Sequence, residues 1–203
     1  METLIAVAGI VTVASITPGP NNFVVMAAAV RGGYVAAVPA MLGVVVGALA
    51  LILLVWAGAD VVFDAMPVLR QLFLTAGVGY LICLGAMMLW QSRPSANSGS
   101  DRAPDLLPQT MVGLASFQVV NPKAWVLVLT ATTAISSDIP SPNSLWLLAL
   151  IFIPISSLCL SLWALAGVSI SSGLGKPVFK RWFDRLMAAL LIPSAAALLV
   201  DGD

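Results

Sequence analysis

Two short polar segments interrupt otherwise apolar stretches of the chain. They comprise, in order, Thr17-Pro18-Gly19-Pro20-Asn21-Asn22 and Asn121-Pro122-Lys123. Pro18 and Pro20 remove two backbone donors and clash with preceding carbonyl groups, so we expect no regular helix through residues 17–22. Carbonyl groups freed in this way cannot face lipid and must be buried in protein or line a wet cavity. Both segments are therefore candidate parts of a ligand site.

Lys123 is the only charged residue deep within an apolar stretch. Centring a lysine in a bilayer costs roughly 2.5–3.5 kcal/mol on insertion scales, and such residues usually face the bundle interior or water. It lies 14 residues from the start of its stretch at residue 109, a rise of about 20 Å that a lysine side chain does not comfortably span. Two interpretations stay open: Lys123 holds the fold by donating to carbonyls of the broken helices, or it holds a substrate carboxylate or couples protons.

The composition places these segments in a membrane protein. Of the 203 residues, 60% are hydrophobic and 9% charged, against about 45–50% and about 25% in soluble domains. Nine basic residues balance nine acidic ones and His is absent, which excludes a basic nucleic-acid-binding surface and His ligands for zinc or haem. Six stretches can each cross about 30 Å of hydrocarbon: 4–30, 35–59, 68–91, 109–135, 144–170 and 182–200.

A polar segment divides the six stretches into two halves. Residues 92–105 read SRPSANSGSDRAPD and predict a solvated linker, 92–108, between the halves 1–91 and 109–203. Three spans per half is an odd number, so the halves lie in opposite orientations. Pro18 and Pro122 are 104 residues apart, and matched interruptions of this kind indicate the midplane site of a transporter. We expect an all-α fold of six transmembrane helices in a 3+3 inverted repeat, with helices 1 and 4 broken.

Positive charges are distributed unequally between the two sides. Seven of them flank the loops after the first, third and fifth spans: Arg31, Arg93, Arg102, Lys176, Lys180, Arg181 and Arg185. Only Arg70 falls on the other side. The positive-inside rule therefore places these loops, including the linker, in the cytoplasm and both termini outside.

Other residues give weaker indications. Gln118 lies one helical turn before Pro122 and could reach the same cavity. Gly43 and Gly47 form a GxxxG that predicts close helix packing, within the monomer or between two copies. Serines of the fifth span, Ser156 among them, could line the pathway but more often bond neighbouring helices. The candidate substrate-binding residues are thus Thr17, Pro18, Gly19, Pro20, Asn21, Asn22, Gln118, Asn121, Pro122 and Lys123.

The segments TPGPNN (17–22) and NPKAW (121–125) resemble the LysE/RhtB superfamily of bacterial amino-acid exporters, and the likeness extends over nearly the whole chain. Residues 116–118 and 163–167 look most similar to its cysteine/O-acetylserine exporter branch. The resemblance implies a multi-pass protein of the bacterial inner membrane that exports an amino acid, driven by the proton-motive force. It implies neither an enzyme nor a bound cofactor.

From the resemblance and the interruptions together we expect a small neutral amino acid as substrate. The N-terminal ends of two half-helices favour an anion, so Lys123 with Asn21, Asn22 and Asn121 would hold the carboxylate. Carbonyls freed by the prolines would accept from the ammonium group, while the two halves rock around the site. Because no Asp or Glu lies deep in any span, a dibasic substrate would bring an unpaired charge.

Two other functional classes stay open. A membrane thiol oxidoreductase would need Cys83 and Cys159 to meet, although they lie in different halves without a nearby cation. A metal-ion transporter would use intramembrane carboxylates, which the spans lack. We expect no catalytic residue and no metal. The expected partners are the amino acid, protons and lipid, with a possible homodimer and no nucleic acid.

Overall fold

The computed structural model describes residues 1–59, 110–136 and 142–174, with isolated positions between 61 and 90 and at 185 and 189. All regular structure in these residues is helical, which confirms the all-α prediction for this part of the chain. The elements are α1 (Glu2–Ile16), α2 (Pro20–Leu54), the π-helix η1 (Val55–Ala59), α5 (Met111–Val120), α6 (Pro122–Ser136) and α7 (Pro142–Leu174). The predicted linker, and most of the spans 68–91 and 182–200, lie outside the described residues.

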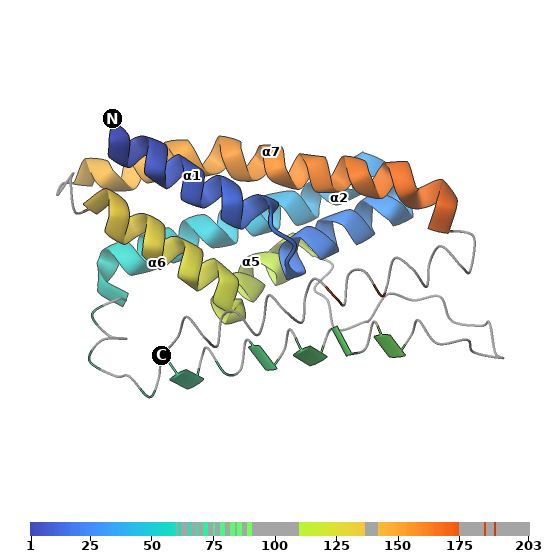
Figure 1. The fold of residues 1–203 in the computed structure, drawn as a ribbon, viewed down its shortest axis with the longest axis horizontal. Helices are drawn as coiled ribbons and strands as arrows, with labels where there is room; N and C mark the ends of the chain where they lie inside the picture. Colours follow the sequence, from blue (N-terminus) through green and yellow to red (C-terminus); the bar gives the residue numbers. More distant parts are fainter. Residues whose placement is uncertain are drawn as a thin grey trace.

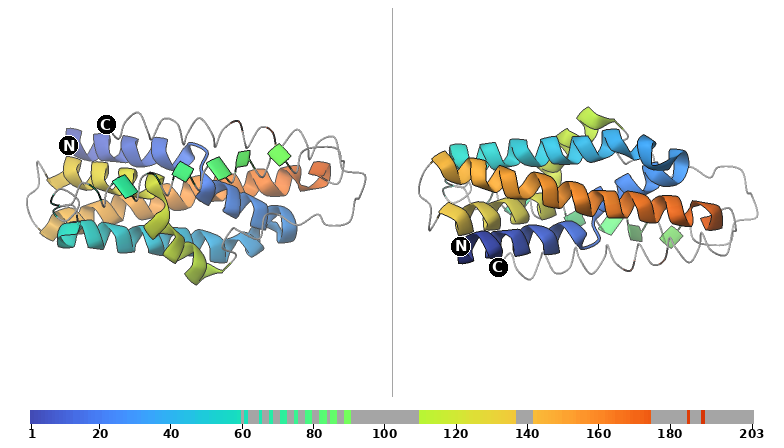
Figure 2. Two further views of the ribbon diagram at one scale, coloured as in Figure 1. Left: turned by 90° about the horizontal axis from the view of Figure 1, so that it is seen from below. Right: turned by 90° about the horizontal axis from the view of Figure 1, so that it is seen from above.

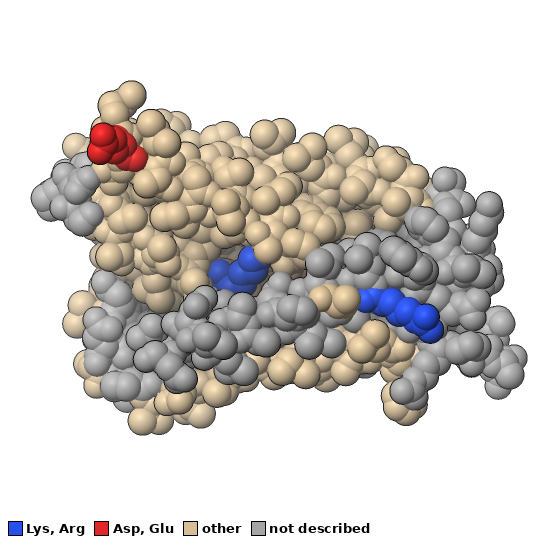
Figure 3. Space-filling view, in the orientation of Figure 1, with Lys and Arg blue, Asp and Glu red and all other residues tan. Residues whose placement is uncertain are grey.

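Most of the described helices run along one long axis of the molecule (Figure 1). Two helical stretches, Pro20–Gly58 and Asn143–Ser171, are long and apolar enough to cross a membrane, and α5 with α6 makes a third if the bent pair is one span. Figure 3 shows charged side chains of the described residues in only a few small areas of one face. An uncharged flank of this kind suits contact with lipid.

The helix α2 consists of two limbs joined at Gly32 and Gly33. Gly33 has φ 77° and ψ −177°, a backbone region essentially restricted to glycine. At this point the chain turns back on itself, as both views of Figure 2 show. The predicted span 4–30 therefore corresponds to α1 with the first limb, and the span 35–59 to the second limb with η1.

The first predicted interruption is confirmed but is shorter than expected. The helix α1 ends at Ile16, Thr17 and Gly19 are extended, and α2 begins at Pro20. A proline is favoured at the first helical position, where its missing N–H would have no partner in any case. Asn21 and Asn22 are consequently helical, which corrects the prediction of irregular backbone through residue 22.

The second interruption is confirmed as a sharp bend. Only Asn121 is non-helical between α5 and α6, with φ −87° and ψ 104°, and the two helices meet at 72°. A residue before proline avoids the α region, so Pro122 both ends α5 and starts α6. The prolines that begin the second half-helices are therefore Pro20 and Pro122, whereas the sequence comparison had paired Pro18 with Pro122.

Two apolar clusters lie on either side of the interruptions. One packs the first limb of α2 against α7 and includes Met26, Leu114 and Leu160. The other packs α1 and α6 against the start of α7 and includes Val11 and Val128. The polar residues of both interruptions therefore occupy a layer between two hydrophobic cores.

The predicted close packing at the GxxxG is confirmed within the chain. A Cβ atom at Gly43 would lie 2.5 Å from the carbonyl oxygen of Met111, and one at Gly47 would lie 2.5 Å from that of Ala115. Only glycine permits this approach of the second limb of α2 to α5. The contact fixes the helix that carries Gln118.

Candidate functional site

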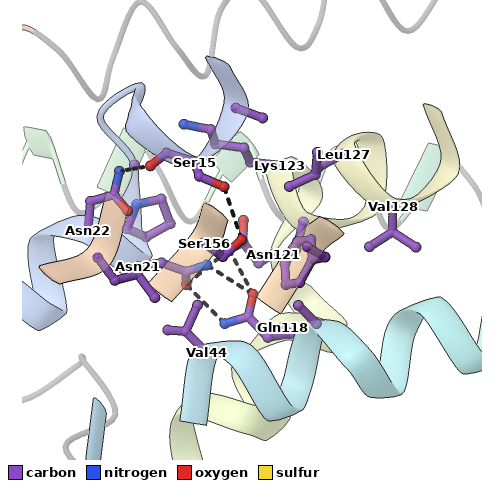
Figure 4. A pocket seen from close by; sticks show the side chains of 17 residues that line it. Ser15, Asn21, Asn22, Val44, Gln118, Asn121, Lys123, Leu127, Val128 and Ser156 are labelled. Carbon is purple, nitrogen blue, oxygen red and sulfur yellow. Dashed lines mark hydrogen bonds between the residues drawn. The ribbon is translucent and has the colours of Figure 1, made fainter. Parts of the chain in front are cut away.

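Both interruptions line one cavity of about 50 Å³ (Figure 4). From the predicted set it contains Gly19, Pro20, Asn21, Asn22, Gln118, Asn121 and Lys123. A single water needs roughly 10–15 Å³ on this measure, so the cavity has room for a few waters in this conformation and none for an amino acid the size of leucine. Of the predicted residues, Thr17, Pro18 and Pro122 do not line it.

A network of three side-chain amides joins the two interruptions. Asn21 Nδ2 donates to Gln118 Oε1, and Gln118 Nε2 donates back to Asn21 Oδ1, both at 3.0 Å. Asn121 Nδ2 donates to Asn21 Oδ1 at 3.2 Å. Gln118 is completely buried, so these bonds form in a low-dielectric environment where they are strong and where breaking them is costly.

The ammonium group of Lys123 joins the first interruption directly. Its Nζ donates to the carbonyl oxygens of Thr17 at 2.6 Å and Pro18 at 3.1 Å. In this conformation these two carbonyls accept from Lys123, and the binding of a substrate ammonium group by carbonyls at the breaks stays a prediction. Of the two interpretations of Lys123, the contacts support the one in which it stabilises the break. A lysine has three donors, so two carbonyl acceptors leave one N–H.

Other carbonyls near the breaks are also taken by side chains. Asn22 Nδ2 donates to the carbonyl oxygens of Ser15 at 3.0 Å and Thr17 at 2.8 Å. Trp163 on α7 donates from Nε1 to the carbonyl of Ile16 at 3.2 Å, which Pro20 cannot reach because it has no N–H. These bonds satisfy the carbonyls of Ser15 and Ile16 at the end of α1.

Trp125 performs the same task at the second break. Its Nε1 donates to the carbonyl of Val119 at 2.7 Å, at a point where the bend separates α5 from α6. Trp125 is also buried in the second apolar cluster. Neither Trp125 nor Trp163 lines the cavity.

The remaining wall of the cavity is largely apolar. The lining residues absent from the predicted set are Ala14, Ser15, Val44, Ala48, Ala124, Leu127, Val128, Phe152, Ser156 and Leu160. Ser15 and Ser156 share a hydrogen bond of 3.2 Å between their hydroxyls. Phe152, Ser156 and Leu160 recur at a spacing of four on α7, and this pattern around a serine is the signal that could have identified them.

The electrostatic character of the cavity is positive. Among the described lining residues Lys123 alone carries a formal charge. The N-terminal ends of α2 and α6 face the same space, and each has the partial positive charge of a helix start. The arrangement can bind an anionic group beside an apolar one.

The two cysteines lie away from this chemistry. Cys159 is buried on α7 and Cys83 is exposed, and both are free thiols. Neither lines the cavity.

Comparison with known proteins identifies relatives. A leucine efflux protein of Enterobacter sp. (strain 638) is 31% identical over 113 residues, which are 54% of this chain and 52% of that protein. One of Klebsiella pneumoniae subsp. pneumoniae has the same identity over 113 residues, 54% of this chain and 51% of the relative. One of Salmonella choleraesuis is 27% identical over 191 residues, 90% of this chain and 88% of the relative. The chain therefore spans about half the length of the first two and most of the third, and no solved structure matches it.

The names of these relatives concern the predicted branch of the superfamily, and a separate family model concerns the family itself. Their names are leucine efflux proteins, so the likeness to the cysteine/O-acetylserine branch stays a prediction. The family model of LysE type translocators matches residues 12–202, including both interruptions. Because this match covers nearly the entire sequence, the chain belongs to the LysE type translocator family.

Proposed function

We propose that this protein exports a neutral amino acid from the cytoplasm and binds it in the cavity between the two helix breaks. The observation that carries the proposal is the convergence of two helix N-termini and one ammonium group on a single cavity. Family membership and the leucine efflux names of the relatives support the same function.

The substrate carboxylate would bind at the helix starts. The first N–H groups of α2 and α6 have no partner within their helices, and the helix dipoles favour a negative charge there. Lys123 adds its charge and its remaining N–H beside them. This site would include the ten residues predicted from sequence, with Thr17 and Pro18 acting through the carbonyls that position Lys123.

The substrate side chain would lie on the apolar wall. Val44, Phe152 and Leu160 offer hydrocarbon surface opposite the polar residues. The described lining contains no carboxylate, so a second positive charge on a dibasic amino acid would be unpaired in a low-dielectric site. A neutral and aliphatic amino acid such as leucine fits this chemistry.

The transport cycle would work by alternating access around the cavity. The bonds Ser15–Ser156, Asn21–Gln118, Lys123–Thr17 and Trp163–Ile16 all join residues before 60 to residues after 110. They therefore connect the two proposed halves, 1–91 and 109–203, of a six-span inverted repeat. The cavity is smaller than leucine in this conformation, so rocking of one half against the other would have to shear these bonds to admit it.

We further propose proton antiport in the bacterial inner membrane, with both termini outside, protons and lipid as partners, and a possible homodimer. The positive charges on the cytoplasmic loops support this orientation.

The function is tested by comparing amino acids in the medium of cells with and without the protein. A rise of one neutral amino acid outside the producing cells is expected. An unchanged amino-acid profile in cells that carry the protein in their membrane would refute export.

The site is tested with Lys123→Ala and Lys123→Met, the second of which keeps most of the aliphatic stem. We expect leucine efflux to fall at least about tenfold in both, because a lost hydrogen bond to a charged group costs roughly 1.5–3 kcal/mol. Membrane abundance, measured by immunoblot, should stay within about twofold of the parent. Parental efflux by either variant would overturn the site assignment.

Proton antiport is tested in the parent protein. Efflux under a fixed leucine gradient should accelerate as external pH falls, and a rate indifferent to pH would exclude antiport.

A further inference from the structure

One polar atom at the second break has no hydrogen-bond partner. Asn121 is 1% exposed and lines the cavity. Its Nδ2 donates to Asn21, but its Oδ1 is buried without any donor. Within the described part of the chain, the only other such side-chain atom is the hydroxyl of Thr132, which does not line the cavity.

The orientation of the Asn121 amide follows from the bonds around it. Gln118 Nε2 donates to the carbonyl of Leu114 at 3.2 Å, which fixes which end of the Gln118 amide carries nitrogen. Asn21 must then present Nδ2 to Gln118 Oε1 and Oδ1 to Gln118 Nε2. Asn121 meets two oxygens of this pair, Asn21 Oδ1 at 3.2 Å and Gln118 Oε1 at 3.5 Å. Only its NH₂ can face them, so exchanging its oxygen and nitrogen would bring oxygens together.

The unpartnered oxygen is also unexpected at this position. Asn121 directly precedes α6, and an asparagine there ordinarily caps the helix by accepting from its second or third N–H. In this structure the Ala124 N–H bonds instead to the Asn121 backbone carbonyl at 3.0 Å. The side-chain oxygen is left available, and a buried acceptor without a donor is rare in proteins.

Four backbone carbonyls at the first break already have donors within the protein. The carbonyls of Thr17 and Pro18 accept from Lys123, that of Ile16 accepts from Trp163, and that of Ser15 accepts from Asn22. Asn121 Oδ1 therefore differs from these oxygens in needing a donor from outside the protein.

Building on the proposed function, we infer that Asn121 Oδ1 accepts a hydrogen bond from the ammonium group of the bound amino acid and selects α-amino acids over their deaminated analogues. Lys123, beside which the substrate carboxylate is proposed to bind, lines the same small cavity as Asn121. An α-amino acid carries its ammonium and carboxylate on one carbon, so both groups can be bound within one such cavity.

The variant Asn121→Ala tests this role with little damage to the network. Asn21 and Gln118 keep their two mutual bonds of 3.0 Å when Asn121 is truncated. The probes are leucine and 2-hydroxy-4-methylpentanoate, which has the same carboxylate and side chain but a hydroxyl in place of the ammonium group. Both compete with labelled leucine in counterflow across proteoliposomes, which needs no proton gradient. Thr132→Val is the matched control, because it removes the other unpartnered polar atom on the same helix outside the cavity.

In the parent and in Thr132→Val we expect leucine to compete at least about tenfold better than the hydroxy analogue. In Asn121→Ala this ratio should fall to within about threefold of unity, through weaker leucine competition, while the analogue competes as before. A ratio unchanged in Asn121→Ala would overturn the inference while leaving the proposed function intact. Absence of leucine counterflow in the parent would instead refute leucine as the substrate of the proposed site. If Asn121→Ala does not reach the membrane, Asn121→Leu, which has the same branching at Cγ and no acceptor, is measured with the same two outcomes.

Discussion

Replacing Gly47 with alanine should damage the candidate site from outside it. The added Cβ would lie 2.5 Å from the carbonyl oxygen of Ala115, 2.8 Å from its Cα and 2.5 Å from Cγ of Gln118. Two of these three atoms are backbone, which cannot rotate away. An ordinary contact begins at 3.4 Å, so α5 must move away from α2 by about 0.9 Å, the difference between 3.4 and 2.5 Å.

The displacement has two measurable consequences. Overpacking of this kind typically costs about 1–3 kcal/mol of stability. The move also displaces Gln118 relative to Asn21 by up to about 0.9 Å, which would distort their two bonds of 3.0 Å. Gly47→Ala should therefore lower both the melting temperature in detergent and the rate of leucine efflux.

Gly9→Ala is the matched control for this variant. An added Cβ at Gly9 meets no atom within 4 Å, so the same chemical change in another apolar helix should leave the melting temperature and efflux close to those of the parent. The two variants are compared by thermal unfolding in one detergent and by efflux normalised to membrane abundance. Equal melting temperatures for Gly47→Ala and Gly9→Ala would show that α5 is not packed against α2 at this point.

Two further substitutions test the turn and the first break. Gly33→Ala should destabilise the protein by about 1–3 kcal/mol. Gly33→Asn should not restore stability, because φ 77° with ψ −177° lies outside the left-handed helical region that asparagine tolerates. An asparagine variant as stable as the parent in thermal unfolding would contradict this backbone conformation. Trp163→Phe keeps an aromatic ring but leaves the Ile16 carbonyl without its donor, so it should lower stability by about 1–3 kcal/mol. An unchanged melting temperature would show that a water molecule donates to this carbonyl in place of the indole N–H.

The positions of both breaks were predictable because proline acts locally. A missing N–H and a fixed φ restrict the backbone whatever surrounds it, and both helices do resume at a proline, Pro20 and Pro122. The length of the first break was not predictable in the same way. Pro18 and Pro20 are both compatible with a helix start, and only the surrounding contacts decide that the helix begins at Pro20.

The partners of Lys123 could not be read from the sequence. Its acceptors are backbone carbonyls 106 and 105 residues away, and a carbonyl oxygen has no residue type that marks it. The sequence indicated only that such a buried charge needs partners, which left both a role in the fold and a role with a substrate or protons open.

The apolar residues that line the cavity could not be predicted from the sequence, for a different reason. In a soluble protein an apolar residue indicates the buried face of a helix, but a membrane helix is apolar on both faces. In α1, Val11 is completely buried while Val13 is 65% exposed, and the sequence does not distinguish them. Val44, Phe152 and Leu160 were therefore visible only once the fold had placed them around polar residues.

The contacts at the breaks connect stability to transport. A helix end without hydrogen-bond partners is costly in a membrane. Around the end of α1, Asn22 donates from α2, in the same proposed half, whereas Lys123 and Trp163 donate from helices of the other proposed half. Any rocking of the halves must exchange the contacts of Lys123 and Trp163, whereas those of Asn22 can persist within the first half. A substrate carboxylate can replace the Thr17 carbonyl as the partner of Lys123, and the Thr17 carbonyl keeps its bond from Asn22, so neither group is left bare. Under the proposed mechanism, substrate binding would thus lower the cost of opening the break, which is the differential interaction that a coupled conformational change requires.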